Sequence, residues 1–347
     1  MTGDDGLVLA GMAVLIALLL HWLPLWRRQS LWFGVTVSPG FSETVEGRRA
    51  LMRYRLWGWT LSVVAVACLL AGAEWHVPAL FPIALFGQIV GASVSFAIVR
   101  LRILPFAVAP SGVRLADMSA APEGLPGGLA AVLIPLGMLA ATAAYLCVRW
   151  DSLAERFPNH WSIDGTPNGW AMRTWQGVFG PLVICAALSI FMLVMAEIII
   201  HATPRECGTG TEAWTVRFRR ATLRLLVVGV WSISAMMCVI SLLPLFGGAR
   251  PPAWTIAILP FIVIATMLPF VIQLVRLTRD SSSGSDGTPD RCWKLGQIYY
   301  NPDDPAIMVE KRFGLGYTLN FGHRGVVLVL GAAILVFGLI RVLIGSR

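Results

Sequence analysis

Charged side chains are scarce in this sequence. Only 13% of its 347 residues are Asp, Glu, Lys or Arg, whereas 56% are hydrophobic and the mean hydropathy is +0.72. Soluble domains usually carry about 25% charged residues, because charge keeps their surface hydrated. The composition therefore excludes an ordinary soluble globular domain and predicts an integral membrane protein.

Patterns that mark catalytic and metal sites are missing as well. The six cysteines form no C-x-x-C pair and no disulfide framework, so we interpret them as small apolar side chains. There is no H-E-x-x-H, no G-x-S-x-G and no Walker loop. We expect a protein that is not an enzyme and has no catalytic residues, no bound metal and no cofactor.

Long apolar runs are what the sequence has instead. A bilayer core of ~30 Å needs about 20 apolar residues per helix. The predicted fold is an all-α polytopic membrane protein with about eight transmembrane helices and a small cytoplasmic β unit before the last helix. The apolar runs lie at about 6–26, 56–73, 78–99, 127–148, 177–200, 222–246, 252–275 and 325–343.

The basic residues fall mainly on one side of the predicted spans. Loops 27–55, 100–126, 201–224 and 276–324 hold 21 of the 27 Lys and Arg residues. Because cytoplasmic loops are enriched in Lys and Arg, both termini and the loop 149–176 are predicted to be extracytoplasmic. We expect a multi-pass protein of the bacterial cytoplasmic (inner) membrane. The arginines are too dispersed to predict nucleic-acid binding.

Composition divides the chain into six consecutive regions. They are an N-terminal three-helix membrane region (1–126), a helix-loop-helix region (127–200), a two-helix membrane region (201–279), a flexible linker rich in Ser and Gly (280–290), a small cytoplasmic β unit (291–324) and the last transmembrane helix (325–347).

The β unit is predicted from its alternation of strand-like and turn-like segments. The runs IYY, AIMVEKR and YTLNF are separated by the turns NPDDP and GLG. Asp303 and Asp304 in the first turn are carboxylates that a metal would accept. A Pro-Asp-Asp-Pro sequence is nevertheless first of all a turn, and that interpretation is favoured.

The loop RFPNHWSIDGTPNGW, residues 156–170, is much more polar than the runs on either side. Its prolines and glycines predict a compact series of turns. Two interpretations stay open: a His–Asp hydrogen bond that holds the turn, and a metal site, for which two ligands are too few by themselves. We predict a binding surface formed by Pro158, His160, Trp161, Asp164, Gly165, Pro167 and Asn168.

A second candidate site lies near the cytoplasmic end of the fifth span. Glu197 is followed four residues later by His201, which places both on one helix face. A carboxylate within the bilayer is costly and predicts a proton- or ion-related role, whereas a glutamate this close to the boundary also reaches headgroup water. Both interpretations are retained.

The polar loop also carries a resemblance to a known family. P-N-H-W-S-I-D-G-T-P-N resembles the signature P-x-H-[aromatic]-x-x-x-G-x-P-[Asp/Asn] of a domain of unknown function. That domain occurs in SdpI-like bacterial membrane proteins, which are related to the sporulation-delay-toxin immunity protein. Asn168 stands where aspartate is more usual. The segments GQIYYNPDDP and VEKRFGLGYTLNF are similar to a second uncharacterised domain often found near the C-terminus of such proteins.

The resemblance implies a receptor or immunity protein. Such a protein would recognise a peptide toxin or another partner outside the membrane and signal to a cytoplasmic regulator. Two further hypotheses come from other classes: an accessory subunit of a larger membrane complex, and a transporter that uses Glu197. A transporter should show broken helices and a polar midplane cavity, whereas a subunit should bury lipid-level surface against other chains.

Overall fold

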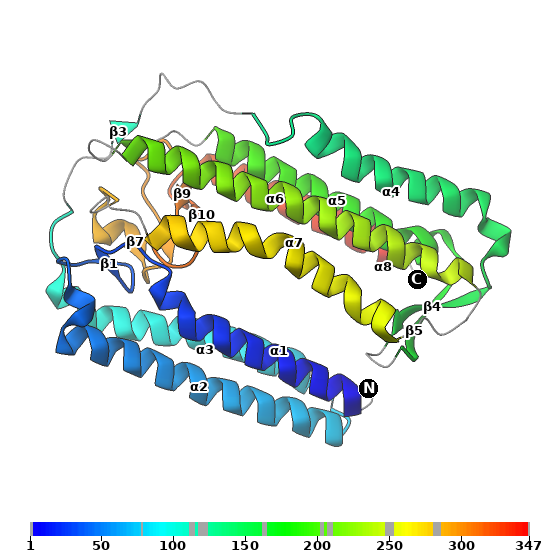
Figure 1. Cartoon of the computed structure of the whole chain (residues 1–347), viewed down its shortest axis with the longest axis horizontal. Coiled ribbons are helices and arrows are strands. Elements are labelled where there is room, and N and C mark those ends of the chain that lie inside the picture. The colour runs from blue at the N-terminus through cyan, green and yellow to red at the C-terminus, as the bar shows by residue number, and fades with distance from the viewer. Residues whose placement is uncertain are drawn as a thin grey trace. The chain divides into compact units, whose positions relative to one another are not determined.

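Helices dominate the fold, as the apolar runs predict. The computed structural model describes residues 3–77, 79–110, 115–116, 124–161, 165–201, 205–206, 211–246, 253–279 and 286–345. Within these residues the helices are α1 (Gly3–Trp22), α2 (Val45–Glu74), α3 (Leu80–Ile103), α4 (Ala130–Val148), α5 (Trp175–Ile200), α6 (Thr211–Leu242), α7 (Ala253–Arg279) and α8 (Gly325–Gly345) (Figure 1).

The strands are short and form two-stranded pairs. They are β1 (Leu31–Trp32) with β2 (Val35–Thr36), β3 (Leu115–Ala116) with β6 (Arg205–Glu206), β4 (Arg156–Trp161) with β5 (Pro167–Met172), β7 (Trp293–Lys294) with β8 (Ile298–Tyr299), and β9 (Met308–Glu310) with β10 (Tyr317–Leu319). All five pairs are antiparallel.

Six helices of the described chain are long and apolar enough to cross a membrane. These are α2, α3, α4, α5, α6 and α7. The first and last predicted spans coincide with α1 and α8, whose described apolar parts, Leu9–Leu25 and Gly325–Leu335, are shorter. The multi-pass helical fold is therefore confirmed, with six of the eight predicted spans meeting the length requirement within the described residues.

The chain divides into two compact units, each built from segments distant in sequence. Unit 1 comprises Met1–Ala120, Thr203–Phe218 and Leu274–His323, and unit 2 comprises Ala121–Ala202, Arg219–Gln273 and Arg324–Arg347. The regions predicted as consecutive along the sequence are distributed over both units. The predicted β unit and the N-terminal helices accordingly share unit 1.

In unit 1, helices α1, α2 and α3 lie side by side (Figure 1). Gln88 of α3 is almost fully buried, and its amide donates to the carbonyl oxygen of Ala13 in α1 at 2.9 Å and to the hydroxyl of Ser62 in α2 at 2.8 Å. Interhelical hydrogen bonds of this kind hold apolar helices together where lipid offers no polar partner. A polar residue within the predicted span 78–99 thus finds its partners on the neighbouring helices.

Six of the short strands of unit 1 lie in two segments that pack together, namely β1, β2, β7, β8, β9 and β10. We call residues 23–44 and 286–323 the docking layer. Strands β8, β9 and β10 fall within the three runs predicted as strands. In the turn between β8 and β9, the Asp304 carboxylate accepts from the hydroxyl of Tyr299 at 2.8 Å and from the N–H of Ala306 at 3.0 Å. These bonds support the turn interpretation of Asp303 and Asp304.

Unit 2 is built around α4, α5 and α6. The indole N–H of Trp231 in α6 donates to the carbonyl oxygen of Ala131 in α4 at 3.3 Å. The hydroxyls of Ser189 in α5 and Ser234 in α6 lie 3.3 Å apart, and both residues are buried. A buried cluster joins these helices to the β4–β5 hairpin and includes Leu139 and Leu146 of α4, Leu182 of α5, Cys238 of α6 and Phe157 of β4.

The polar loop of unit 2 is a β-hairpin, and the expected series of turns is wrong. Strands β4 and β5 pair through Arg156 with Met172, Phe157 with Ala171, Pro158 with Trp170, His160 with Gly169, and Trp161 with Pro167. The register shifts on both sides of His160, which marks bulges. A bulge allows a two-stranded ribbon to contain prolines, which cannot donate a hydrogen bond to the neighbouring strand. The prolines of this segment therefore did not exclude strands, although the prediction of turns relied on them.

Candidate functional site

The β4–β5 hairpin carries the residues predicted to bind. His160 is exposed, and its Nδ1 lies 2.5 Å from the side-chain oxygen of Asn168 on the opposite strand. Because that oxygen is an acceptor, the contact fits an Nδ1–H that donates to it. The sequence suggested a hydrogen bond between His160 and Asp164, and Asp164 lies outside the described residues; among the described residues, Asn168 is the partner of His160 Nδ1.

Two glycines shape the hairpin for different physical reasons. Gly165 has a φ of +80°, as the sequence predicts, and this conformation is strained for side chains with a Cβ. At Gly169 the reason is space: a Cβ there would lie 2.7 Å from the Cβ of His160 and 3.0 Å from the amide oxygen of Asn159. The absence of a side chain at Gly169 therefore brings the two strands close at His160.

The other predicted binding residues do not all face outward. Trp161 is buried, with 9% of its surface exposed, and its indole N–H has no hydrogen-bond partner among the described residues. Pro158 and Pro167 are half-buried within the strands. Trp161 therefore anchors the hairpin, and the predicted binding residues that are exposed in the described hairpin are His160 and Asn168, beside the exposed Arg156 and Asn159.

Aromatic rings lie where the hairpin meets α5. Trp150 stacks on Trp175 with ring centroids 5.3 Å apart, and both pack against Phe179 at 6.0 and 5.0 Å. On the hairpin, the guanidinium of Arg156 lies 5.0 Å from the ring centre of Trp170. Aromatic residues with one apolar and one wet side are typical of the membrane interface, which fits the predicted position of this loop.

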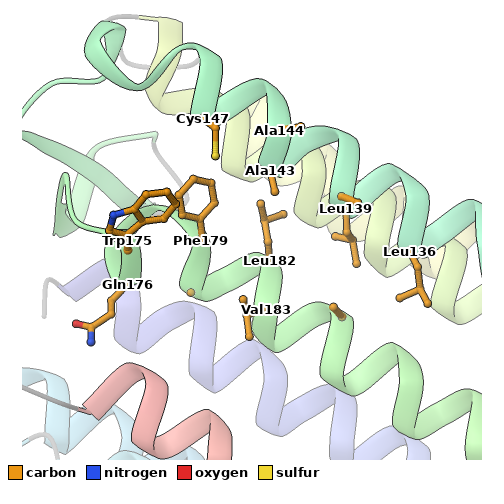
Figure 2. Close-up of a pocket in the computed structure, with 13 residues that line it drawn as sticks. Leu136, Leu139, Ala143, Ala144, Cys147, Trp175, Gln176, Phe179, Leu182 and Val183 are labelled. Atoms are coloured by element: carbon orange, nitrogen blue, oxygen red, sulfur yellow. The ribbon is translucent and has the colours of Figure 1, made fainter.

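Beneath these rings, an apolar groove runs between α4 and α5. Its volume is about 550 Å³, within the range of small-molecule and side-chain binding sites. Figure 2 shows Leu139, Ala143 and Cys147 of α4 directed toward the α5 side chains, with Trp175 and Phe179 together at one end and Leu136 toward the other. The lining is Leu136, Leu139, Ala140, Ala143, Ala144, Cys147, Trp175, Gln176, Phe179, Gly180, Leu182, Val183 and Ala186.

The composition of this groove restricts what it binds. Alanines of α4 and Gly180 of α5 form its floor, since small side chains leave the space open. Cys147, Gln176 and the indole N–H of Trp175 are the only polar side-chain groups of the lining. A polar or charged group placed here would lose its water without gaining partners, so the groove suits an apolar side chain or acyl chain.

The second predicted site, Glu197 and His201, is solvent- or lipid-facing. His201 follows the last residue of α5, and its Nε2 lies 4.0 Å from the Glu197 carboxylate. The side chains are 68% and 53% exposed for His201 and Glu197 respectively. The two residues form an i,i+4 pair at a helix end, and no described pocket includes them. This position supports the headgroup-water interpretation more than an ion pathway.

Sequence reasoning missed the buried arginines of unit 1. Arg100, near the end of α3, is 4% exposed and donates to three carbonyl oxygens of the docking layer. These are Gly34 at 2.5 Å, Asp290 at 3.1 Å and Trp293 at 3.2 Å. The sequence does contain an indication of a buried arginine, because Arg100 lies inside the apolar run SFAIVRLRIL. The topology prediction counted it only as one of the basic residues of a cytoplasmic loop.

Arg312 forms the second buried arginine centre. Its guanidinium makes two bonds of 2.7 Å to the Asp286 carboxylate, bonds to Asp290, and donates to the carbonyl oxygen of Gly34 at 3.0 Å. Asp286 and Asp290 lie in the second half of the segment predicted as a linker; residues 280–285 lie outside the described residues. The bonds join the segment after α7 to the loop before α2.

The ionised forms of Arg312 and Asp286 stabilise each other. Burial by itself raises the pKa of Asp286, but the charge and hydrogen bonds of Arg312 outweigh it and hold that pKa below its usual value. Burial likewise lowers the pKa of Arg312, and the carboxylates of Asp286 and Asp290 raise it above its usual value. Both partners therefore stay ionised at neutral pH.

Aromatic packing completes the docking layer. Phe313, next to Arg312, packs on Phe96 of α3 with ring centroids 4.0 Å apart. Phe96, Tyr54 and the loop residues Trp32 and Phe33 form one buried cluster. The layer is consequently held to α2 and α3 by apolar burial and to α3 also by Arg100, whereas the bonds of Arg312 join the two segments of the layer to each other. No group of three or more His, Cys, Asp or Glu that would hold a metal is found in the described residues.

Together these features define a polytopic helical membrane protein in which unit 2 has a β-hairpin and an apolar groove and unit 1 has the docking layer. Residues 137–185 match DUF1648, a domain of unknown function, and residues 302–327 match DUF5808, a family of unknown function. Comparison with curated proteins and with solved structures gives no match. The predicted presence of two domains of unknown function is confirmed.

The matched ranges coincide with the two structural features. The DUF1648 range contains the whole hairpin and every groove residue except Leu136 and Ala186. The DUF5808 range contains β9, β10, Arg312 and Phe313. Hairpin and groove are thus parts of one domain type, and the docking layer includes the other.

Proposed function

We propose that this protein is a non-enzymatic membrane receptor or immunity protein that binds an amphipathic peptide through the β4–β5 hairpin and the α4–α5 groove. The polar part of the peptide contacts His160 and Asn168, and an apolar side chain enters the groove beside Trp175 and Phe179. The observation that carries the proposal is the exposed polar pair and the apolar groove within one matched domain.

The cellular setting is part of the same proposal. The Lys and Arg asymmetry and the resemblance of the hairpin sequence to SdpI-like proteins support a bacterial inner membrane protein with extracytoplasmic termini and hairpin. A peptide arriving from outside would then meet the hairpin first. The docking layer would lie on the cytoplasmic side, where it is suited to contact a cytoplasmic regulator.

Filling the groove tests the proposal. Ala143 lines the groove, whereas Ala141 on the same helix is exposed and does not. Purified full-length protein in nanodiscs is titrated calorimetrically with a panel of synthetic membrane-active amphipathic peptides. We expect wild type to bind at least one of them. Ala143→Phe should weaken that binding about 10- to 100-fold, because burial of one apolar side chain is worth about 1.5–3 kcal/mol. Ala141→Phe should bind as wild type does.

Three outcomes contradict the proposal. Binding of no peptide in the panel rejects it, as does equal binding by the two phenylalanine variants. Native mass spectrometry supplies the third: a lipid that copurifies with wild type and with Ala141→Phe, but not with Ala143→Phe, would make the groove a lipid site. His160→Ala serves as a second variant, expected to weaken peptide binding while the melting temperature shifts by less than about 2 °C.

One observation favours the accessory-subunit alternative. The apolar window of α7 is only 6% buried, compared with 28–33% in the other five candidate spans. A helix with so little contact inside its own chain has most of its surface available to lipid or to another membrane protein. Copurification of other membrane subunits in stoichiometric amounts in mild detergent would support this alternative over the receptor proposal.

A further inference from the structure

A second cavity, unrelated to the groove, lies in unit 1 and is lined mainly by polar groups. Its volume is about 610 Å³. It lies at the ends of α1 and α7, beside the part of the docking layer that follows α1. Its lining is Leu25, Arg27, Gln29, Gly40, Ser42, Glu43, Arg276 and Arg279. Three guanidinium groups and one carboxylate therefore line it.

Arg27 is fixed in place before any ligand arrives. Its guanidinium lies 4.3 Å from the ring centre of Trp32, which is almost fully buried. Its Nη1 donates to the carbonyl oxygens of Arg28 and Gln29, both at 3.0 Å. Burial lowers the pKa of Arg27 to about 10, which still leaves it charged at neutral pH. A charge held on a rigid support loses little side-chain entropy on binding.

Arg276 and Arg279 contribute from the last turn of α7. They are three residues apart, so both side chains project from one helix face, and both are exposed. The backbone of this turn is held by Trp214, whose indole N–H donates to the carbonyl oxygen of Leu277 at 2.6 Å. The two arginines therefore extend from a fixed turn toward the same cavity as Arg27.

The remaining polar groups of the lining are also compatible with a bound anion. The Ser42 hydroxyl and the Gln29 amide are neutral donors. Glu43 is exposed at the rim and leaves the cavity with an excess of two positive charges. Guanidinium groups match the geometry of phosphate and carboxylate oxygens through paired N–H bonds, and a phosphate, which has more oxygens than a carboxylate, offers acceptors to several guanidinium groups at once.

We propose that this cavity binds a phosphate group, supplied by the headgroup of an anionic phospholipid. The location supports the lipid as the source: α7 is a candidate span, and the ends of a membrane-spanning helix lie near the headgroups. Basic pockets between transmembrane helices are a recurrent way of binding lipid phosphates. A bound headgroup would tie the end of α7 to the loop after α1.

The test compares two matched double variants of the full-length protein. Arg276→Gln/Arg279→Gln removes two charges from the cavity, and Arg291→Gln/Lys294→Gln removes two exposed charges of unit 1 that do not line it. Native mass spectrometry of protein in detergent measures the binding of phosphatidylglycerol and phosphatidylcholine. We expect wild type and the control to prefer phosphatidylglycerol, and the cavity variant to lose at least tenfold in apparent affinity for it. Glu43→Gln should increase that affinity.

A second arm distinguishes the source of the phosphate. Inorganic phosphate is added to lipid-depleted protein, and thermal stability is followed. A free-phosphate ligand would raise the melting temperature of wild type but not of the cavity variant, without any preference for phosphatidylglycerol, and would overturn the lipid assignment. Equal lipid affinities for the cavity and control variants, with no phosphate effect, would overturn the site itself. Unchanged melting temperatures of both double variants in detergent verify that folding is intact.

Discussion

Replacing Arg312 by methionine should destabilise unit 1 strongly at neutral pH. The Arg312 side chain is 1% exposed and is ion-paired with Asp286 and Asp290, each of whose side chains is 16% exposed. Methionine fills much of the arginine volume but leaves two carboxylates without their cation. Removing one partner of a buried pair costs about 3–5 kcal/mol, which corresponds to a fall in melting temperature of about 6–20 °C for a unit of this size.

The loss should depend on pH in a direction fixed by Asp286. In wild type its pKa is lowered, so its contribution to stability is present above the unfolded value of about 3.9 and is lost as pH falls through the folded value. Without Arg312, burial raises the pKa of Asp286 instead, and protonation then stabilises the variant. The difference between wild type and Arg312→Met should therefore narrow as pH falls from 7 toward 4.

Differential scanning fluorimetry in detergent measures both effects. Arg291→Met is the control, since Arg291 is exposed and belongs to the same segment. Adding Asp286→Asn to Arg312→Met should recover part of the loss, because one uncompensated charge is removed. A melting temperature of Arg312→Met within about 2 °C of wild type at every pH would refute the reasoning. It would mean that the ion pairs of Arg312 with Asp286 and Asp290 do not contribute to stability.

Three further predictions concern unit 2 and the topology. Gly169→Ala places a Cβ 2.7 Å from a cross-strand Cβ and should cost about 1–3 kcal/mol, whereas Gly137→Ala, which meets nothing within 4 Å, should leave the melting temperature unchanged or higher. With the native cysteines replaced by alanine, a cysteine at Asn159 should react with an impermeant reagent from outside intact cells and one at Asp303 should not; the reverse pattern would invert the orientation. Glu197→Gln should leave proton flux into liposomes unchanged, and loss of a wild-type flux would restore the transporter hypothesis.

The helices and the β unit were predictable because their patterns are local. An apolar run of about 20 residues specifies a span wherever it lies, and NPDDP and GLG mark turns through proline and glycine alone. The hairpin was harder. Its two strands contain Pro158, Pro167 and Gly169, residues that strand propensities penalise, and the closeness of His160 to Gly169 is a cross-strand property that one segment does not display.

The docking layer was not predictable for a similar reason. Arg312 bonds Gly34 across 278 residues, and Arg100 bonds Trp293 across 193. From the sequence, each arginine was counted as a loop charge, because neighbouring residues in the chain do not indicate which distant residue it bonds. The aspartates of DGTPDRCW were equally ambiguous, since serine- and glycine-rich neighbours indicated a linker. The contact of His160 with Asn168 was not predicted either, because Asn168 lies on the opposite strand and the segment was expected to be a series of turns.

The 278-residue separation between Gly34 and Arg312 has a consequence for biosynthesis. At ~5–20 residues per second, the ribosome reaches Arg312 roughly 15–55 s after Gly34. For most of that interval Trp32, Phe33 and Tyr54 have been made, whereas Asp286, Asp290 and Phe313 have not. The N-terminal helices must therefore wait in the membrane with an incomplete aromatic cluster at their end. A ribosome that stalls before Arg312 would leave an inserted but unfinished protein, recognisable to membrane proteases by that exposed cluster.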